Sequence, residues 1–166
     1  MKMDLIQPFI SAVDAVLAET LQSPVTVSDL AMEEEGYRKR GVAAMIVFKG
    51  EIEGRVILDV EPRAAIRVAS NISGEEIAES EQIVRETVCE LANMVIGNAV
   101  TLLNDRGFKF KVFPPSIHTE EQISNAGAEV EAMILSFATE HGSVFINIAL
   151  HYLRRRQNER RTVAVS

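Results

Sequence analysis

Hydrophobic residues in this chain follow the order helix, strand, hairpin twice, and this repetition constrains the fold more than any single motif. The first set consists of an amphipathic helix, an alternating strand and two β-branched runs: Leu5–Leu21, Val25–Met32, Val42–Phe48 and Arg55–Val60. The second set has the same order: Glu81–Leu103, Phe108–Phe113, Glu129–Ala138 and Val144–Tyr152. The pattern predicts an α+β fold, in which an antiparallel sheet of about six strands packs against long helices and the two halves are pseudo-duplicated.

The connecting segments are predicted from their turn-forming and polar residues. Glu61-Pro62 opens a short helix that runs through Ser70, and Ser80 is the expected N-cap of the long helix. Gly107 is the expected stop at the other end of that helix. Glu33–Arg40 is predicted to be a charged turn and Ser116–Gly127 a polar loop.

Length and charge restrict the class of protein. The 166 residues are most simply one domain covering residues 1–153, followed by a basic tail at residues 154–166 that we expect to be flexible. The tail holds five Arg and one Glu, so residues 1–153 carry a net charge of −11. An acidic body argues against nucleic acid as a ligand. Because no apolar run reaches 18 residues, we expect no membrane insertion.

The single cysteine and the N-terminus indicate the compartment. Cys89 cannot form an internal disulfide, and the N-terminal residues lack the pattern of a signal peptide. We therefore expect a cytoplasmic protein. Six strands would leave sheet edges that must be covered or paired, and a second copy could pair with them, so we also expect a homodimer.

The long helix Glu81–Leu103 carries the residues with the clearest chemical potential. At about 100° per residue, one broad face is predicted to be buried, made of Ile83, Thr87, Leu91, Met94, Val95, Asn98 and Leu102. A separate stripe within an arc of roughly 60° is formed by Glu86, Glu90, Asn93 and Gly97. Gly97 is unusual there, because Gly in a helix interior costs about 1 kcal/mol relative to Ala. Its missing side chain would let the backbone of a partner come close.

Other familiar catalytic patterns are absent from the sequence. His118, His141 and His151 are scattered without the spacing of metal ligands, so no metal site is expected. Cys89 on a helix is interpreted as a packing residue. No phosphate-binding glycine loop and no nucleophile elbow occurs. A self-sufficient active site is therefore not visible.

The segment ELANMVIGN, which contains Glu90 and Asn93, resembles the helix motif of the CheC/CheX/FliY family of chemotaxis phosphatases and looks most like CheX. In that family an acidic residue or Ser is followed four residues later by Glu. An Asn comes three residues after this Glu, and a Pro comes about two dozen residues after the Asn. Glu86, Glu90, Asn93 and Pro115 occupy these places, with Glu86 in place of Asp or Ser and the Pro spacing one residue short. The order of elements resembles the family over nearly the whole chain.

This resemblance implies a phosphatase that accelerates hydrolysis of the aspartyl phosphate on a CheY-like response-regulator receiver domain. Asn93 would position the attacking water and Glu90 would pair with the receiver's Lys, and these two are the expected catalytic residues. Glu86 and Gly97 are expected to bind the partner. No cofactor would be bound by this chain, since Mg²⁺ is expected on the receiver. A single motif resembles dimeric CheX rather than two-site CheC.

Three other interpretations stay open. The chain could be a non-catalytic dimeric adaptor that binds a receiver domain or another signalling partner. It could be a small-ligand sensor with a crevice between its helices and sheet. Alternatively, Glu90 and Asn93 could be ordinary solvated residues on an exposed helix face.

Overall fold

The protein is described from a computed structural model that places residues 3–22, 24–33, 37–118, 122–123 and 132–152. Within these residues the helices are α1 (Met3–Leu21), α2 (Pro62–Ser73) and α3 (Glu81–Asp105). The strands are β1 (Thr26–Glu33), β2 (Tyr37–Arg38), β3 (Val42–Gly50), β4 (Ile52–Val60), β5 (Phe110–Val112), β6 (Ser116–His118), β7 (Gln122–Ile123), β8 (Ala132–Thr139) and β9 (Gly142–Tyr152). The α+β class is confirmed.

The main sheet is antiparallel and its two halves exchange edge strands. Its seven strands have the order β1-β8-β9-β4-β3-β5, with β6 also paired to β3. Strand β1 comes from the first half of the chain but pairs with β8 of the second half, whereas β5 and β6 pair back onto β3 of the first. The β4–β9 pair joins the two halves at the centre. This arrangement supports the predicted pseudo-duplication.

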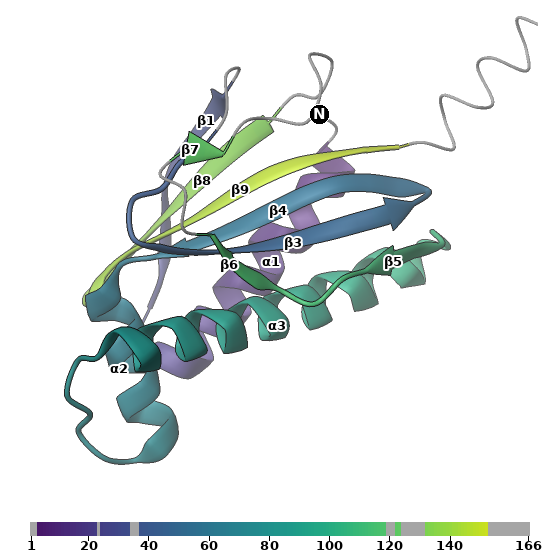
Figure 1. Ribbon diagram of the computed structural model, residues 1–166. Helices are drawn as coiled ribbons and strands as arrows, with labels where there is room; N and C mark the ends of the chain where they lie inside the picture. Colours follow the sequence, from purple (N-terminus) through teal and green to yellow (C-terminus); the bar gives the residue numbers. More distant parts are fainter. Residues whose placement is uncertain (1–2, 23, 34–36, 119–121, 124–131, 153–166) are drawn as a thin grey trace, which may run out of the picture.

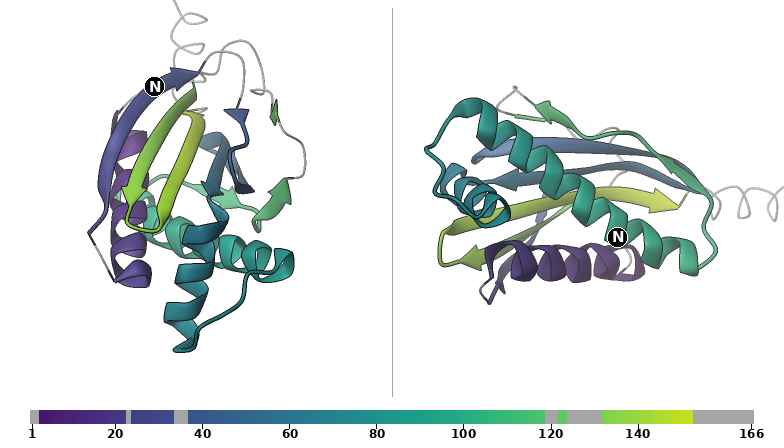
Figure 2. Two further views of the ribbon diagram at one scale, coloured as in Figure 1. Left: turned by 90° about the vertical axis from the view of Figure 1, so that its left-hand side faces the viewer. Right: turned by 90° about the horizontal axis from the view of Figure 1, so that it is seen from below.

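One face of the sheet is covered by helices. Figures 1 and 2 show α1 and α3 lying across the same face, with α2 at one end. Alternate residues of the two central strands point toward these helices and are buried: Val56, Leu58, Val60, Ile146, Ile148 and Leu150. Because side chains alternate between the two faces of a strand, the β-branched runs of the sequence place one residue in two in this core.

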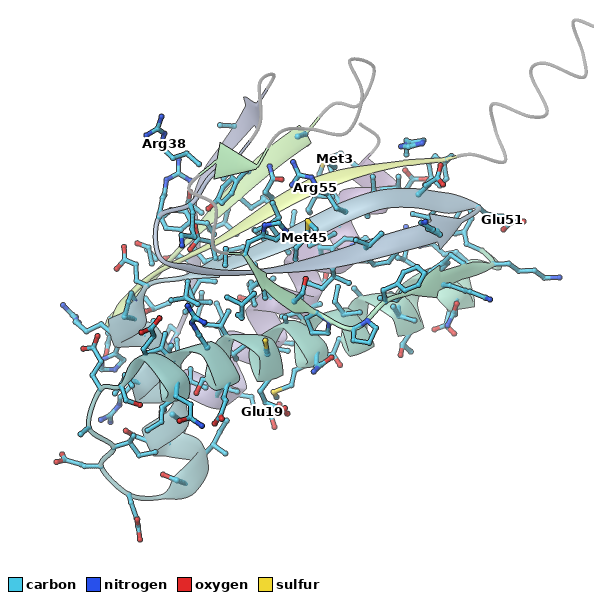
Figure 3. All side chains as sticks on the ribbon, viewed as in Figure 1. Met3, Glu19, Arg38, Met45, Glu51 and Arg55 are labelled. Carbon is cyan, nitrogen blue, oxygen red and sulfur yellow. The ribbon has the colours of Figure 1, made fainter. Side chains whose placement is uncertain are left out.

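The opposite face carries a smaller cluster around Tyr37, on the side to which Met45 and Arg55 belong (Figure 3). The Tyr37 hydroxyl donates to the buried carboxylate of Asp59 at 2.6 Å. The backbone N–H groups of Arg40 and Gly41 donate to the same carboxylate at 2.6 and 2.8 Å. Burial, followed by the Asp59 charge, raises the pKa of Tyr37 well above its ordinary value. These bonds tie the segment before β3 to the centre of the sheet.

Two predicted loops contain strands instead. Ser116–Gly127 was predicted to be a polar loop, but β6 and β7 lie within it. The predicted turn Glu33–Arg40 contains β2, whose Tyr37 is fully buried. These strands are two or three residues long and pair at an edge or with each other, so they lack the alternating apolar run that identifies a strand in sequence.

The first hairpin is also tighter than predicted. The sequence predicts strands over Val42–Phe48 and Arg55–Val60, but β3 and β4 extend into residues 49–54 between these runs, and only Glu51 separates them. Gly50 and Gly54 have positive φ angles of 130° and 131°, and a Cβ on Gly54 would lie 2.0 Å from the Ala149 carbonyl oxygen. Glycine therefore allows the ladder to continue through these residues.

None of the described helices is long and apolar enough to cross a membrane. The basic tail predicted at residues 154–166, and part of the strand predicted from Glu129, lie outside the described residues. The assignment of residues 1–153 to one domain stays a prediction.

Candidate functional site

Helix α3 is fixed at both ends by local sequence. The predicted N-cap is confirmed, because the Ser80 hydroxyl accepts a hydrogen bond from the Ile83 N–H at 3.2 Å. Gly107, beyond the last turn, has a left-handed φ of 87° and donates its N–H to the Asn104 carbonyl. Glu90 and Asn93 lie in the middle of this 25-residue helix, away from ends that could fray.

The buried face of α3 is rotated from the predicted one. Asn98 and Leu102 were predicted to face the core but are exposed, with Leu102 at 40%. The residues buried instead include Val84, Val88, Ala92, Ala99 and Leu103. The cause is that α3 packs against α1 as well as the sheet (Figure 2), so its buried arc turns toward both neighbours. Helical period alone does not reveal the second contact.

The polar stripe lies on the opposite, exposed side of α3. Glu86, Glu90, Asn93 and Gly97 are all exposed, and the helical geometry directs them into the same arc. Within the described residues no ion pair involves Glu86 or Glu90, and Asn93 has no hydrogen-bond partner for its side chain. The carboxylate of Glu90 and the carboxamide of Asn93 are therefore available to an incoming molecule.

Gly97 has no packing role inside the protein. A Cβ placed on it would meet nothing within 4 Å, so the surrounding structure leaves room for a side chain. The Thr101 hydroxyl donates to the Gly97 carbonyl at 3.0 Å, which keeps that polar group within the helix. The stripe therefore has open space at this point.

Two side-chain contacts at the start of α3 determine which of its charged residues are paired. Arg85 pairs with Glu81 at 2.9 Å, and both lie to one side of the stripe. On the stripe itself, the Gln82 amide donates to the Glu86 carboxylate at 3.0 Å. Gln82 was not among the residues predicted for the site, although its spacing of four residues from Glu86 was an available signal.

Helix α1 occupies the position related to α3 by the pseudo-duplication but lacks the paired residues. A shift of 83 positions places Gln7 at the position of Glu90 and Ile10 at that of Asn93. The same shift superimposes buried positions Leu5, Pro8, Phe9, Ala12, Val13, Val16 and Thr20 on Val88, Leu91, Ala92, Val95, Ile96, Ala99 and Leu103. Helix α1 contains no Asn, so no register of the duplication gives it a paired Glu and Asn, and one stripe of this kind is present per chain among the described helices.

Residues of other potential chemistry do not join the stripe. Cys89 is half-buried on α3, and burial raises the pKa of its thiol, which lowers the fraction of reactive thiolate. Among the described residues, no group of three or more His, Cys, Asp or Glu side chains could hold a metal ion. His151 lies 3.7 Å from Glu53 on the central strands, away from α3.

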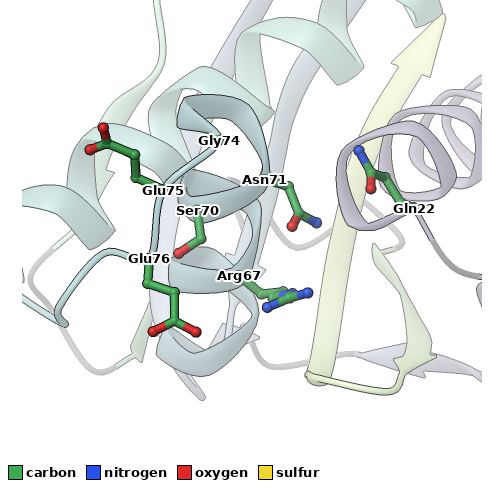
Figure 4. Close-up of a pocket in the computed structure, with 7 residues that line it drawn as sticks. All are labelled: Gln22, Arg67, Ser70, Asn71, Gly74, Glu75 and Glu76. Atoms are coloured by element: carbon green, nitrogen blue, oxygen red, sulfur yellow. The ribbon is translucent and has the colours of Figure 1, made fainter.

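A polar cavity of about 360 Å³ lies where α1 ends beside α2. Figure 4 shows Arg67, Asn71 and Gln22 in the gap between these helices, whereas Glu75 and Glu76 project from the other side of α2. The Asn71 amide already donates to the Thr20 carbonyl at 3.0 Å. Because its charged groups point in different directions, this cavity offers a weaker basis for function than the stripe.

Pro115, the last residue of the motif, is joined to a strand that contacts α3, although it is distant from that helix in sequence. It directly precedes β6, which pairs with β3 and contacts α3. Pro114 and Pro115 separate β5 from this second short strand. The motif thus combines the exposed face of α3 with the strand segment that flanks it (Figure 1).

Comparison with known proteins agrees with this arrangement. The family model described as chemotaxis phosphatase CheX matches residues 42–138. The CheX–CheY–BeF₃–Mg²⁺ complex from Borrelia burgdorferi contains a chain that is 31% identical, with 90% of this chain and 99% of that chain covered and a TM-score of 0.66.

Two further solved structures share the fold. A CheC-like superfamily protein from Shewanella sp. PV-4 has 23% identity, coverage of 91% and 99%, and a TM-score of 0.80. A chemotaxis protein CheX from Desulfovibrio desulfuricans has 23% identity, coverage of 89% and 99%, and a TM-score of 0.76. No curated protein matches. Because the family model covers more than half of the chain, this protein belongs to the CheX family of chemotaxis phosphatases.

Proposed function

We propose that this protein accelerates hydrolysis of the aspartyl phosphate on a CheY-like receiver domain, with Glu90 and Asn93 as its catalytic residues. The observation that carries the proposal is their placement side by side, exposed and without internal partners among the described residues, in the middle of a well-anchored helix. The family assignment supports the choice of substrate, and so does the related complex from Borrelia burgdorferi, which contains a CheX together with a CheY.

Asn93 supplies the positioning of water. A carboxamide has both an acceptor and a donor, so its oxygen can accept from the attacking water while its N–H group contacts a phosphoryl oxygen. Phosphoryl transfer depends more on alignment and charge stabilisation than on covalent chemistry by the protein. A single uncharged residue can therefore complete a site whose phosphoaspartate, Mg²⁺ and Lys belong to the receiver.

Glu90 supplies the docking contact. Its carboxylate pairs with the receiver's Lys and fixes the register in which Asn93 meets the phosphoryl group. Glu86 adds a contact one turn before Glu90, and Gly97 permits close approach one turn after Asn93. This assignment needs no metal or cofactor on the chain itself, and a receiver substrate implies work in the cytoplasm.

The test is phosphate loss from phosphorylated receiver domains incubated with the natural protein, Asn93→Ala and Glu90→Ala. We expect the natural protein to accelerate hydrolysis, Asn93→Ala to lose the acceleration while still binding, and Glu90→Ala to lose both. Asn98→Ala is a matched control, because Asn98 is exposed on the same helix but lies about 80° round from Glu90 and about 140° from Asn93.

Equal decay with the natural protein and with Asn93→Ala, accompanied by receiver binding, would reject the phosphatase proposal and favour a non-catalytic adaptor. A receiver that binds elsewhere on the surface would leave Glu90 and Asn93 as ordinary solvated residues. Heteronuclear NMR of the labelled receiver–protein complex distinguishes these cases, because it maps the contacted face directly.

We also propose that the protein forms a homodimer. In the described structure β1 pairs only with β8, and β5 and β6 pair only with β3, so both edges of the main sheet have unused backbone groups. Val27 and Phe113, near these edges, are 49% and 45% exposed. Light scattering after size exclusion tests the mass. A monomeric mass would contradict the homodimer, and a dimer interface that covers Glu90 and Asn93 would contradict the docking site.

A further inference from the structure

We infer that Gln82 is a positioning residue, which orients the Glu86 carboxylate toward a second cationic group on the receiver while leaving the charge of that carboxylate intact. This inference rests on the proposed function. It starts from the 3.0 Å hydrogen bond between Gln82 Nε2 and Glu86 Oε1 on the exposed stripe. One oxygen of Glu86 is thereby held, and the other remains available to a partner.

The charges around Glu86 support this role. Glu86 and Glu90 are like-charged residues four positions apart, an arrangement that is slightly unfavourable on an isolated helix. Arg85 could have relieved it, but Arg85 pairs with Glu81 at 2.9 Å on another side of the helix. Neither Glu86 nor Glu90 takes part in an ion pair within the described residues. The stripe therefore keeps two uncompensated negative charges one helical turn apart.

The chemical type of residue 82 matters for the same reason. A lysine at this position would also reach Glu86, but it would neutralise the carboxylate before a partner arrived. A carboxamide donates a hydrogen bond without adding charge, so it restricts the Glu86 rotamer and preserves the attraction for a cation. The partner chemistry implied is a Lys or Arg side chain about one helical turn from the Lys that pairs with Glu90.

The experiment measures receiver affinity and hydrolysis for Gln82→Ala, Gln82→Lys, Glu86→Ala and the double variant Gln82→Ala/Glu86→Ala. We expect Gln82→Ala to raise KM about twofold and Gln82→Lys about fivefold, both with kcat unchanged. The affinity of Gln82→Lys should also depend less on ionic strength, because one attractive charge has been neutralised. In the Glu86→Ala background, Gln82→Ala should have no further effect.

Gln7→Ala is the matched control. Gln7 makes a contact of the same four-residue spacing on α1, where its amide donates to the Ser11 hydroxyl at 3.4 Å, and α1 has no paired Glu and Asn. Loss of this exposed contact should leave KM unchanged. If both changes merely weakened their helices, thermal unfolding would shift alike in the two variants while KM stayed constant.

The outcomes separate this inference from the proposed function. Accelerated hydrolysis with unchanged KM in both Gln82 variants would overturn the positioning role alone. Receiver binding that follows the expected order without any hydrolysis would overturn the phosphatase activity but retain the docking role. An effect of Gln82→Ala that persists without Glu86 would show that Gln82 acts on its own, and absence of both binding and hydrolysis would reject both proposals.

Discussion

Gly97 shows how one residue can indicate an external partner. Glycine within a helix costs about 1 kcal/mol of stability relative to alanine. Internal packing gives no reason for it here, since a Cβ would meet nothing within 4 Å. Internal packing therefore does not explain this glycine, and the proposed docking of a receiver next to Glu90 and Asn93 would account for it.

We therefore predict that Gly97→Ala stabilises the protein and weakens receiver docking. Urea unfolding should show a gain of up to about 1 kcal/mol. The KM for phosphorylated receiver should rise several-fold, because the new methyl group occupies the space that the partner needs. A stabilised variant with unchanged KM would show that the glycine is not at the contact, and Asn98→Ala again serves as the exposed control.

Tyr37 leads to a prediction about pH. Burial and the Asp59 charge raise its pKa far above 10, the ordinary value, so the folded state favours the neutral phenol. The resulting stabilisation is present below pH 10 and declines as pH rises above it. Thermal unfolding between pH 8 and pH 11 should show a steeper loss of stability for the natural protein than for Tyr37→Phe.

Tyr152 contributes in the same direction, since burial and its hydrogen bond to Asp4 also raise its pKa. Tyr37→Phe should consequently remove only part of the loss of stability that occurs as the pH rises from 8 to 11. Identical slopes for Tyr37→Phe and the natural protein would contradict the assigned contribution. Below pH 9, Tyr37→Phe should be less stable by about 1 kcal/mol, because Asp59 loses one of its three donors.

At the scale of elements, we predict that removing the N-cap of α3 lowers the stability of the protein but does not change its phosphatase activity. Ser80→Ala removes the acceptor for the Ile83 N–H and should cost about 1 kcal/mol in urea unfolding. Glu90 lies ten positions beyond Ser80, so kcat should stay unchanged. A fall in kcat at full stability would mean that the first turn takes part in catalysis directly.

Elements defined by long periodic runs could be predicted from sequence, whereas three of the short strands could not. The helices and the two hairpins have a clear period of 3.6 or 2. Strands β2, β6 and β7 consist of two or three residues and exist because a distant strand supplies their hydrogen bonds. Such pairing depends on the exchange of edge strands between the halves, and no local pattern encodes that exchange.

Helical periodicity predicted part of the candidate site but not its tertiary contacts. Helical geometry alone places Glu86, Glu90, Asn93 and Gly97 on one stripe, and the structure shows all four exposed. The contact from Gln82 depends on side-chain conformation, which periodicity does not specify. The buried arc was misplaced at Asn98 and Leu102 because the contact of α3 with α1 is a tertiary effect. The roles of the stripe residues remain predictions.

For the whole molecule, pseudo-duplication raises the question of how many receivers one chain can serve. The two halves place α1 and α3 side by side on the same face of the sheet (Figure 2), so both helices could present a docking surface. The shift of 83 positions nevertheless puts Gln7 and Ile10 where α3 has Glu90 and Asn93, and α1 contains no Asn that another register could bring there. Ile10 is half-buried and apolar, and it can neither orient water nor contact a phosphoryl oxygen.

We therefore predict one receiver per chain. Calorimetric titration with an activated receiver should give a stoichiometry of one per protomer, or two per homodimer. Asn93→Ala should lose all accelerated hydrolysis, since no second centre exists among the described helices to provide a remainder. Two receivers per protomer, or residual acceleration in Asn93→Ala that disappears when Gln7 is also changed, would show that α1 carries a working site. In that case function would be duplicated along with the fold.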